Sequence, residues 1–230
     1  MTESAWLSCR DPQPMLLDLP RPPTERKLRL LGCGCCRAVW DLFTDDRSRA
    51  AVEVVERFAD GDATETEMWA AYRESSVARD LAVGPDSTAS RRHRSLAGRC
   101  TSWAAHVLTN VSPHPNPVPV VQDDLIEALA QLQHAQWGRF RSVRASQVEL
   151  VREVFGNPFR PVVFNPAWRT DTVLALASQM YGSRQFGAMP ILADALQDAG
   201  CENEAILAPC RQPSAHARGC WVADELLGRE

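Results

Sequence analysis

The sequence predicts an all-α protein, an irregular multi-helix bundle of about nine or ten helices. Apolar residues recur at spacings of three and four through most of the chain, which is the period of an amphipathic helix. Capping residues or glycines stand at the ends of most of these segments. A strand-like pattern occurs only at Val162–Phe164, within a proline-rich extended crossover that we expect at residues 156–168.

The segment before Thr24 predicts short elements. Residues 3–9 are expected to form one or two helical turns with Trp6 turned inward. Asp11-Pro12 is a helix-start signal, and the apolar residues that follow it give a short buried face. Pro20, Pro22 and Pro23 then predict a stiff extended connection.

The first long helix is predicted over residues 25–43, with Thr24 as its N-cap. Its apolar positions cover a wide face, so we expect it to pack on two sides. Gly32 and Gly34 each cost a helix interior about 1 kcal/mol relative to alanine. Small residues at these positions predict that another helix crosses close to this one.

Helix ends identify the next elements. Asp45 or Asp46 is expected to cap a helix that ends at Gly61. Thr64 and Glu67 form a capping box for the following helix, because each side chain reaches the other's backbone N–H. Three more helices are expected before the crossover, over 88–109, from Asp123 or Asp124 toward a bend near Gly138, and from a Ser146–Glu149 capping box to Gly156.

Four helices are expected after the crossover. Their predicted bounds are Thr170 to Gly182, the turn containing Pro190 to Gly200, Asn203 to Leu207, and residues 217–227. Thr170 and Asn203 are read as N-caps, and Pro190 suits a first helical turn because its missing N–H has no partner there.

The crossover organises the predicted domain arrangement. Gly156 is able to end a helix in a left-handed conformation, and Pro158, Pro161 and Pro166 exclude helix beyond it. Its apolar residues need burial: Phe155, Phe159, Val162, Val163, Phe164 and Trp168. We therefore expect a strap that joins an N-terminal helical part, residues 1–155, to residues 156–230 as one globular unit.

Composition excludes several classes of function. The 230 residues carry a net charge of −4, which argues against general binding to nucleic acid or anionic membranes. No apolar run is long enough to span a bilayer, and the N-terminus lacks the features of a secretory signal. We therefore expect a cytoplasmic protein whose eight cysteines are reduced thiols.

The sharpest candidate constellation is Cys201, Cys210, His216 and Cys220. Three cysteines and a histidine could close a tetrahedral zinc site. The spacing has no C-x2-C pair, and small buried residues fit the same positions, so ordinary packing is the competing interpretation.

The other candidates have plain structural explanations. Cys33, Cys35 and Cys36 lie on different faces of one helix and suit core packing, and Cys100 does not share a face with His106. Two arginine runs, one around His93 (Arg91, Arg92 and Arg94) and one at Arg139, Arg141 and Arg144, suit a solvated surface better than a phosphate or nucleic-acid site. The chain has no phosphate loop and no motif of a known hydrolase. We assign no catalytic, cofactor-binding or metal residue and no cofactor from sequence.

Several segments resemble a paralogous family of uncharacterised helical proteins of planctomycete bacteria. These are ESAWLSCRDPQPML, RKLRLLGCGCCRAVWDLFTDDRSRAAVEVVERFADG, REVFGNPFRPVVFNPAW, MPILADALQDAGCENEAIL and HARGCWVADELLG. The resemblance covers both ends of the chain and is looser over about residues 64–145. It implies a bacterial, cytoplasmic protein present in many copies and brings no activity, ligand or catalytic residue. By analogy it favours an interaction or regulatory role.

Three hypotheses for function follow. The first is a non-enzymatic interaction or regulatory module that binds another protein through a groove or apolar patch near the strap and the Pro113–Pro119 loop. The second is an enzyme whose Cys/His site is assembled by the fold, with His93, His106 or His216 against a thiol or carboxylate. The third is a C-terminal module stabilised by zinc. The sequence leaves the substrate, the partner and the oligomeric state open.

Overall fold

A computed structural model describes residues 1–83, 96–110, 118–135, 140–212 and 216–229. This part of the chain confirms the all-α prediction: it contains helices and no strand. The α-helices are α1 (Glu3–Ser8), α2 (Pro12–Leu17), α3 (Glu25–Arg37), α4 (Asp46–Ala59), α5 (Glu65–Val83), α7 (Leu96–Leu108), α8 (Val118–Ala135), α9 (Phe140–Phe155), α10 (Asp171–Ser183), α11 (Met189–Asp198), α12 (Glu204–Arg211) and α13 (Trp221–Leu227). Three 3-10 turns lie at Trp40–Leu42, Pro166–Trp168 and Phe186–Ala188.

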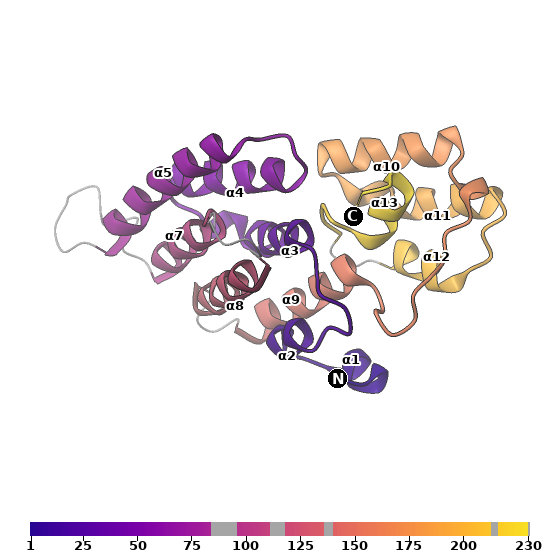
Figure 1. Ribbon diagram of the computed structural model, residues 1–230, viewed down its shortest axis with the longest axis horizontal. Helices are drawn as coiled ribbons and strands as arrows, with labels where there is room; N and C mark the ends of the chain where they lie inside the picture. Colours follow the sequence, from indigo (N-terminus) through magenta and orange to yellow (C-terminus); the bar gives the residue numbers. More distant parts are fainter. Residues whose placement is uncertain (84–95, 111–117, 136–139, 213–215, 230) are drawn as a thin grey trace.

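The helices form two groups that lie side by side (Figure 1). Helices α1–α9 make up one group and α10–α13 the other, with α3 and the end of α9 facing the second group. Each group has its own hydrophobic core, and the strap connects the two groups in the sequence. We predicted that the chain divides between residues 155 and 156 and that its two parts pack as one globular unit. Both statements stay predictions.

Helix α3 is the central element of the first core. It packs against α4, α7, α8 and α9, as the wide apolar face predicts. A Cβ added to Gly32 would lie 2.5 Å from a methyl group of Leu108 on α7, so the expected close crossing is present there. A Cβ on Gly34 would lie 3.3 Å from that of Ala217, which comes from the C-terminal part of the chain.

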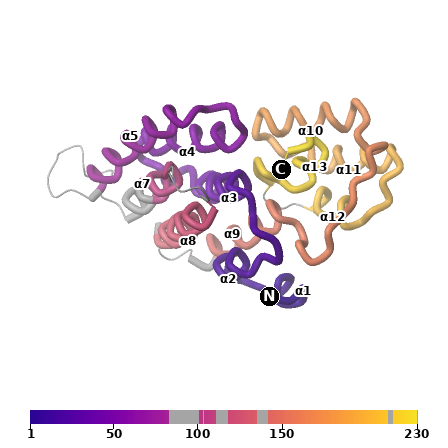
Figure 2. Tube along the Cα trace, in the orientation of Figure 1, coloured from indigo at the N-terminus to yellow at the C-terminus, as the bar shows by residue number. Residues whose placement is uncertain are grey.

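The strap is extended, as expected, and Figure 2 shows it running from α9 along the second helix group to α10. Gly156 ends α9 at φ 62°. Phe159 packs beside Trp6 of the first core, and Phe164 contacts Trp168 and Trp221 in the second. One expectation was wrong: Val163 is 87% exposed, because it points away from the face that packs on the second core.

Most predicted N-caps are present. Thr24, Asp45, Thr170 and Asn203 each accept a backbone N–H of their helix. The Thr64–Glu67 capping box forms in both directions. Local side-chain chemistry therefore determines where these helices begin.

Several predicted boundaries were wrong because a longer helix gains more packing. Helix α8 begins at Val118, with Pro119 in its first turn, so Asp123 and Asp124 lie inside it. Helix α9 runs through Ser146 without a break, since Val143 and Val148 both pack on the first core.

The other boundary corrections are smaller. Helix α3 stops at Arg37, short of residue 43, and a 3-10 turn follows it. Helix α10 continues past Gly182, α12 extends to Arg211 beyond Leu207, and α13 begins at Trp221 instead of residue 217. The predictions at 88–95, Pro113–Pro117 and Gly138 lie outside the described residues.

Candidate functional site

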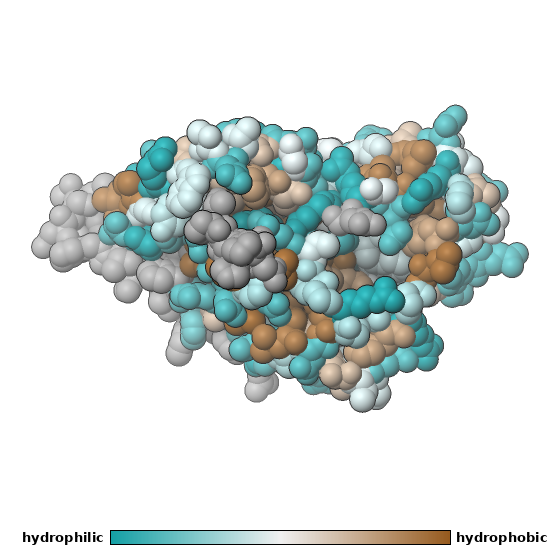
Figure 3. Space-filling model, viewed as in Figure 1, coloured by the Kyte–Doolittle hydropathy of each residue, from teal (hydrophilic) through white to brown (hydrophobic). Residues whose placement is uncertain are grey.

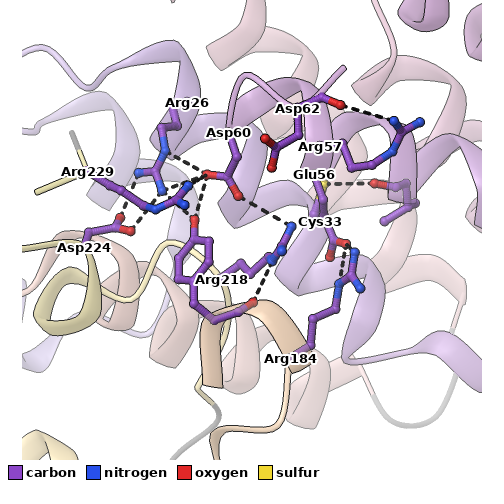
Figure 4. Close-up of polar contacts among 12 residues, drawn as sticks. Arg26, Cys33, Glu56, Arg57, Asp60, Asp62, Arg184, Arg218, Asp224 and Arg229 are labelled. Carbon is purple, nitrogen blue, oxygen red and sulfur yellow. Dashed lines mark hydrogen bonds and ion pairs between the residues drawn. The ribbon is translucent and has the colours of Figure 1, made fainter. Parts of the chain in front are cut away.

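The two helix groups meet through a buried network of charges (Figure 4). Its first hub is Asp60, the C-cap of α4, whose side chain is fully buried. Arg26 donates its Nε–H to Oδ1 of Asp60 over 3.1 Å, and the Tyr181 hydroxyl donates to the same oxygen over 2.7 Å. Arg218 and Arg229 lie 3.5 and 3.4 Å from the carboxylate. One carboxylate of the first group thus holds three cations and a hydroxyl, and most of these come from the second group.

Asp224 on α13 is the second hub. Both terminal nitrogens of Arg26 donate to its two oxygens over 2.9 Å, and Nζ of Lys27 donates to it over 2.5 Å. Lys27 also donates to the carbonyl groups of Val154 and Gly219. The only lysine of the chain therefore contacts α9, α13 and the turn before α13.

Glu56 on α4 is the third hub and holds one arginine from each group. Arg37 donates to both oxygens of Glu56 over 3.0 and 2.9 Å, and Arg184 donates its Nε–H over 2.7 Å. Arg184 has a left-handed backbone, at φ 59°, and is the only residue other than glycine with positive φ in the described part of the chain. That conformation costs roughly 1 kcal/mol for an L residue, and here it directs the guanidinium toward Glu56.

A cavity of about 230 Å³ opens beside Glu56, at the junction of the two groups. Its walls are Leu30, Gly34, Arg37, Ala38, Glu56, Leu150, Arg184, Phe186, His216, Ala217 and Arg218. Three guanidinium groups and one carboxylate line it, so the lining has a surplus of two positive charges. The rest of the wall is mainly apolar, which lowers the local dielectric and strengthens the field of the guanidinium groups.

Glu56 favours the charged form of Arg37 on the wall of the cavity. Burial alone would lower the pKa of Arg37, but the hydrogen bond and the charge of Glu56 outweigh burial and raise it. Burial would also lower the pKa of Arg26, but the hydrogen bond and charge of Asp224, together with Tyr181 and Asp60, raise it. Burial and the adjacent carboxylates raise the pKa of Tyr181, so its hydroxyl remains a hydrogen-bond donor. The cavity therefore presents fixed positive charge and is suited to an anionic group.

A second cluster adjoins this cavity. Nδ1 of His216 lies 2.8 Å from Oε1 of Glu153, and the Cys220 thiol also bonds to Glu153. The ligand atoms of the three residues lie within 4.8 Å of one another. The side chains of His216 and Glu153 are each 7% exposed, and Cys220 is 1% exposed.

The structure brings only two of the four residues of the zinc hypothesis into this cluster. His216 and Cys220 come together around Glu153, a residue that sequence did not indicate. Cys210 is buried nearby, and its pKa rises to about 12 because of burial and then the charge of Glu153. Cys201 is also buried, in the second core.

The remaining candidates are not gathered into this site. Cys33, Cys35 and Cys36 pack in the first core as free thiols. His106 lies 3.3 Å from the hydroxyls of Ser75 and Ser76, and burial lowers its pKa. Arg144 pairs with Asp11. The side chains of Arg91, Arg92, His93, Arg94, Cys100, Arg139 and Arg141 lie outside the described residues.

Sequence reasoning missed most residues of the site. Glu56, Asp60 and Glu153 occupy positions that look like ordinary solvated helix faces, because Arg184, Tyr181 and His216, which pair with them in that order, are 128, 121 and 63 positions away in the sequence. The one available signal was the spacing of Glu56 and Asp60, which puts two carboxylates on one face at the end of α4.

Two further hollows, of about 750 and 440 Å³, flank Trp221 beside the strap. They share Gly156, Asn157, Ala205 and Trp221, and charges of both signs line each of them. On the face in Figure 3, hydrophobic residues form small patches among hydrophilic ones. Three carboxylates and one guanidinium line the larger hollow, and four cations and two carboxylates line the smaller one. The binding groove that we expected near the strap stays a prediction.

None of the helices described here is long and apolar enough to cross a bilayer. No protein-family model, no curated protein and no solved structure matches this chain.

Proposed function

We propose that the protein is a non-enzymatic interaction module that binds an acidic anchor of a protein partner in the cationic cavity. One observation carries the proposal: Arg37, Arg184 and Arg218 converge on a single cavity that contains only one carboxylate. Arginine clusters of this kind recognise carboxylates and phosphates, because the planar guanidinium donates two parallel hydrogen bonds.

The shape of the cavity agrees with such an anchor. A volume of about 230 Å³ holds one side chain of a partner and not a whole cofactor. Leu30, Leu150 and Phe186 would contact the aliphatic part of an aspartate or glutamate side chain. Arg37 and Arg184 share Glu56, and each guanidinium has five N–H donors, so donors remain for a second carboxylate.

A peptide selection tests the proposal. A library of random displayed peptides is selected on the full chain, and binding of the recovered peptides is measured by fluorescence anisotropy. We expect enrichment of peptides with an acidic residue next to an apolar one. R184Q should weaken their binding roughly tenfold to a hundredfold, since a hydrogen bond to a charged group contributes about 1.5–3 kcal/mol.

Arg211 provides the matched control. It is 38% exposed, pairs with Asp194 at the surface, and lies away from the cavity. R211Q should leave peptide binding unchanged. Selected peptides without acidic residues, or equal effects of R184Q and R211Q, would contradict the proposal and would direct attention to the hollows beside Trp221.

An enzyme is the second candidate, because His216 does lie against a carboxylate and a thiol. A thiol acts as a nucleophile only as the thiolate. Burial and the charge of Glu153 raise the pKa of Cys220 well above its usual value, which opposes that role. Alkylation of Cys220 by iodoacetamide at neutral pH, at the rate of an activated thiol, would favour the enzyme.

The wider assignments belong to the same proposal. Grouping with the planctomycete family is supported by the GNPFRP and GCWVADELLG motifs. A cytoplasmic location is supported by the cysteines, since the seven described ones are all free thiols. A bacterial origin rests on the resemblance to that family alone.

A further inference from the structure

We infer that Glu153, His216 and Cys220 form a zinc-binding site that links the first helix group to the second. Glu153 lies near the end of α9, whereas His216 and Cys220 belong to the turn before α13. The donors are one carboxylate, one imidazole and one thiol, which are the three ligand types that zinc prefers in proteins. This inference does not depend on the proposed function of the cationic cavity.

The distances suit zinc after small side-chain shifts. In a tetrahedral site with bonds of about 2.0–2.3 Å, neighbouring ligand atoms lie roughly 3.3–3.7 Å apart. Here the three ligand atoms lie within 4.8 Å of one another, and Nδ1 of His216 lies 2.8 Å from Oε1 of Glu153. Changes of about 1 Å at side-chain ends therefore bring all three to bonding distance.

The charges also balance. Without metal, Glu153 accepts hydrogen bonds from the imidazole and the thiol, and burial favours the neutral thiol. On zinc binding the Cys220 thiol would release its proton to solvent, and the proton on Nδ1 of His216 would move to Nε2, so that the sulfur and Nδ1 each offer a lone pair to the ion. Zn²⁺ with one thiolate and one carboxylate carries no net charge, so the occupied site avoids the cost of a buried unpaired ion.

Two hollows adjoin the site. Glu153 lines the larger hollow beside Trp221, and His216 lines the cationic cavity. Two of the three ligand residues therefore each line a hollow, and Cys220 lies behind them. Cys210 is a further buried thiol near the cluster, since the charge of Glu153 raises its pKa and its charge acts on Cys220.

The test uses the full chain in reducing buffer. Protein freed of metal with a chelator is mixed with zinc chloride, passed through a desalting column and measured for metal content and thermal unfolding. We expect one zinc ion per chain and a rise in melting temperature, because zinc binds the folded chain preferentially. Cobalt(II) in place of zinc should give the absorption of a tetrahedral ion with a thiolate ligand.

Variants separate this site from adventitious binding. H216N and E153Q should each weaken zinc binding by at least about tenfold. C201A is the matched control, since Cys201 is a buried thiol of the same region outside the cluster, and it should retain the ion. A wild-type chain that holds no zinc after desalting would overturn the inference. So would a thiolate–cobalt absorption that H216N retains in full and C201A loses.

Discussion

Replacement of Asp60 by asparagine should cost the protein about 3 kcal/mol of unfolding free energy. Asparagine has the shape of aspartate and still accepts the hydrogen bond from the Tyr181 hydroxyl, so the substitution removes mainly a charge. Asp60 is fully buried and faces Arg26 and Arg218, whose side chains are each only 13% exposed. Breaking a buried ion pair by removing one partner typically costs 3–5 kcal/mol, because the other charge stays buried.

The lower end of that range applies for two reasons. Arg26 keeps both hydrogen bonds to Asp224, so it is not left alone. Arg229 is 39% exposed, and water already screens its charge, so losing its contact with Asp60 adds little. The cost comes mainly from Arg218, which forms its ion pair with Asp60.

Urea unfolding followed by circular dichroism and by tryptophan fluorescence measures this cost. D194N is the matched control, because Asp194 is 73% exposed and its ion pair with Arg211 lies at the surface. It should change stability by less than about 0.5 kcal/mol. The double variant D60N/R218Q should lose about 1 kcal/mol less unfolding free energy than the two single variants lose in sum. A D60N chain as stable as D194N would refute this account of the network.

Three further predictions concern other parts of the molecule. The thiols should not lower the free energy of unfolding below about pH 9. Above that pH it should fall by up to about 1.4 kcal/mol per pH unit for each thiol. The reason is that burial raises the pKa of five thiols in the folded chain, so only the unfolded chain releases their protons. Urea unfolding in reducing buffer at about pH 8 and 10 checks this, and a flat profile would contradict it; the thiols are Cys33, Cys35, Cys36, Cys210 and Cys220. G219A should lower the melting temperature by an amount equivalent to about 2 kcal/mol, since φ is 88° and a Cβ would lie 3.0 Å from that of Leu30, whereas G182A, with open space around it inside a helix, should not lower it. R152M should cost about 1–2 kcal/mol and speed tryptic cleavage at Arg10, since Arg152 donates to three carbonyl groups at the end of α1.

The fold was predictable where the determinants are local. The N-caps Thr24, Thr170 and Asn203 act within one helical turn, so the sequence around them is sufficient. Boundaries set by distant packing were not predictable. Gly182 is a common helix-ending residue, yet Arg184 takes the left-handed position, because Glu56 on another helix holds its side chain.

The candidate site was largely hidden for the same reason. Periodicity shows which residues face inward, but it does not show which charged residues are buried together. Arg26 and Asp224, which share two hydrogen bonds, are 198 positions apart. The zinc hypothesis pointed to the right segment through His216 and Cys220, and it missed Glu153, which reaches the cluster from α9.

The order of the two cores along the chain has a consequence for biosynthesis. All buried residues of the first core lie at or before Val154, so that core is able to fold on the ribosome before the second has been made. During that interval Arg26 and Lys27 have no access to Asp224, and Asp60 lacks the hydroxyl of Tyr181. The nascent chain then displays a charged, open docking face that closes only when its last helix arrives.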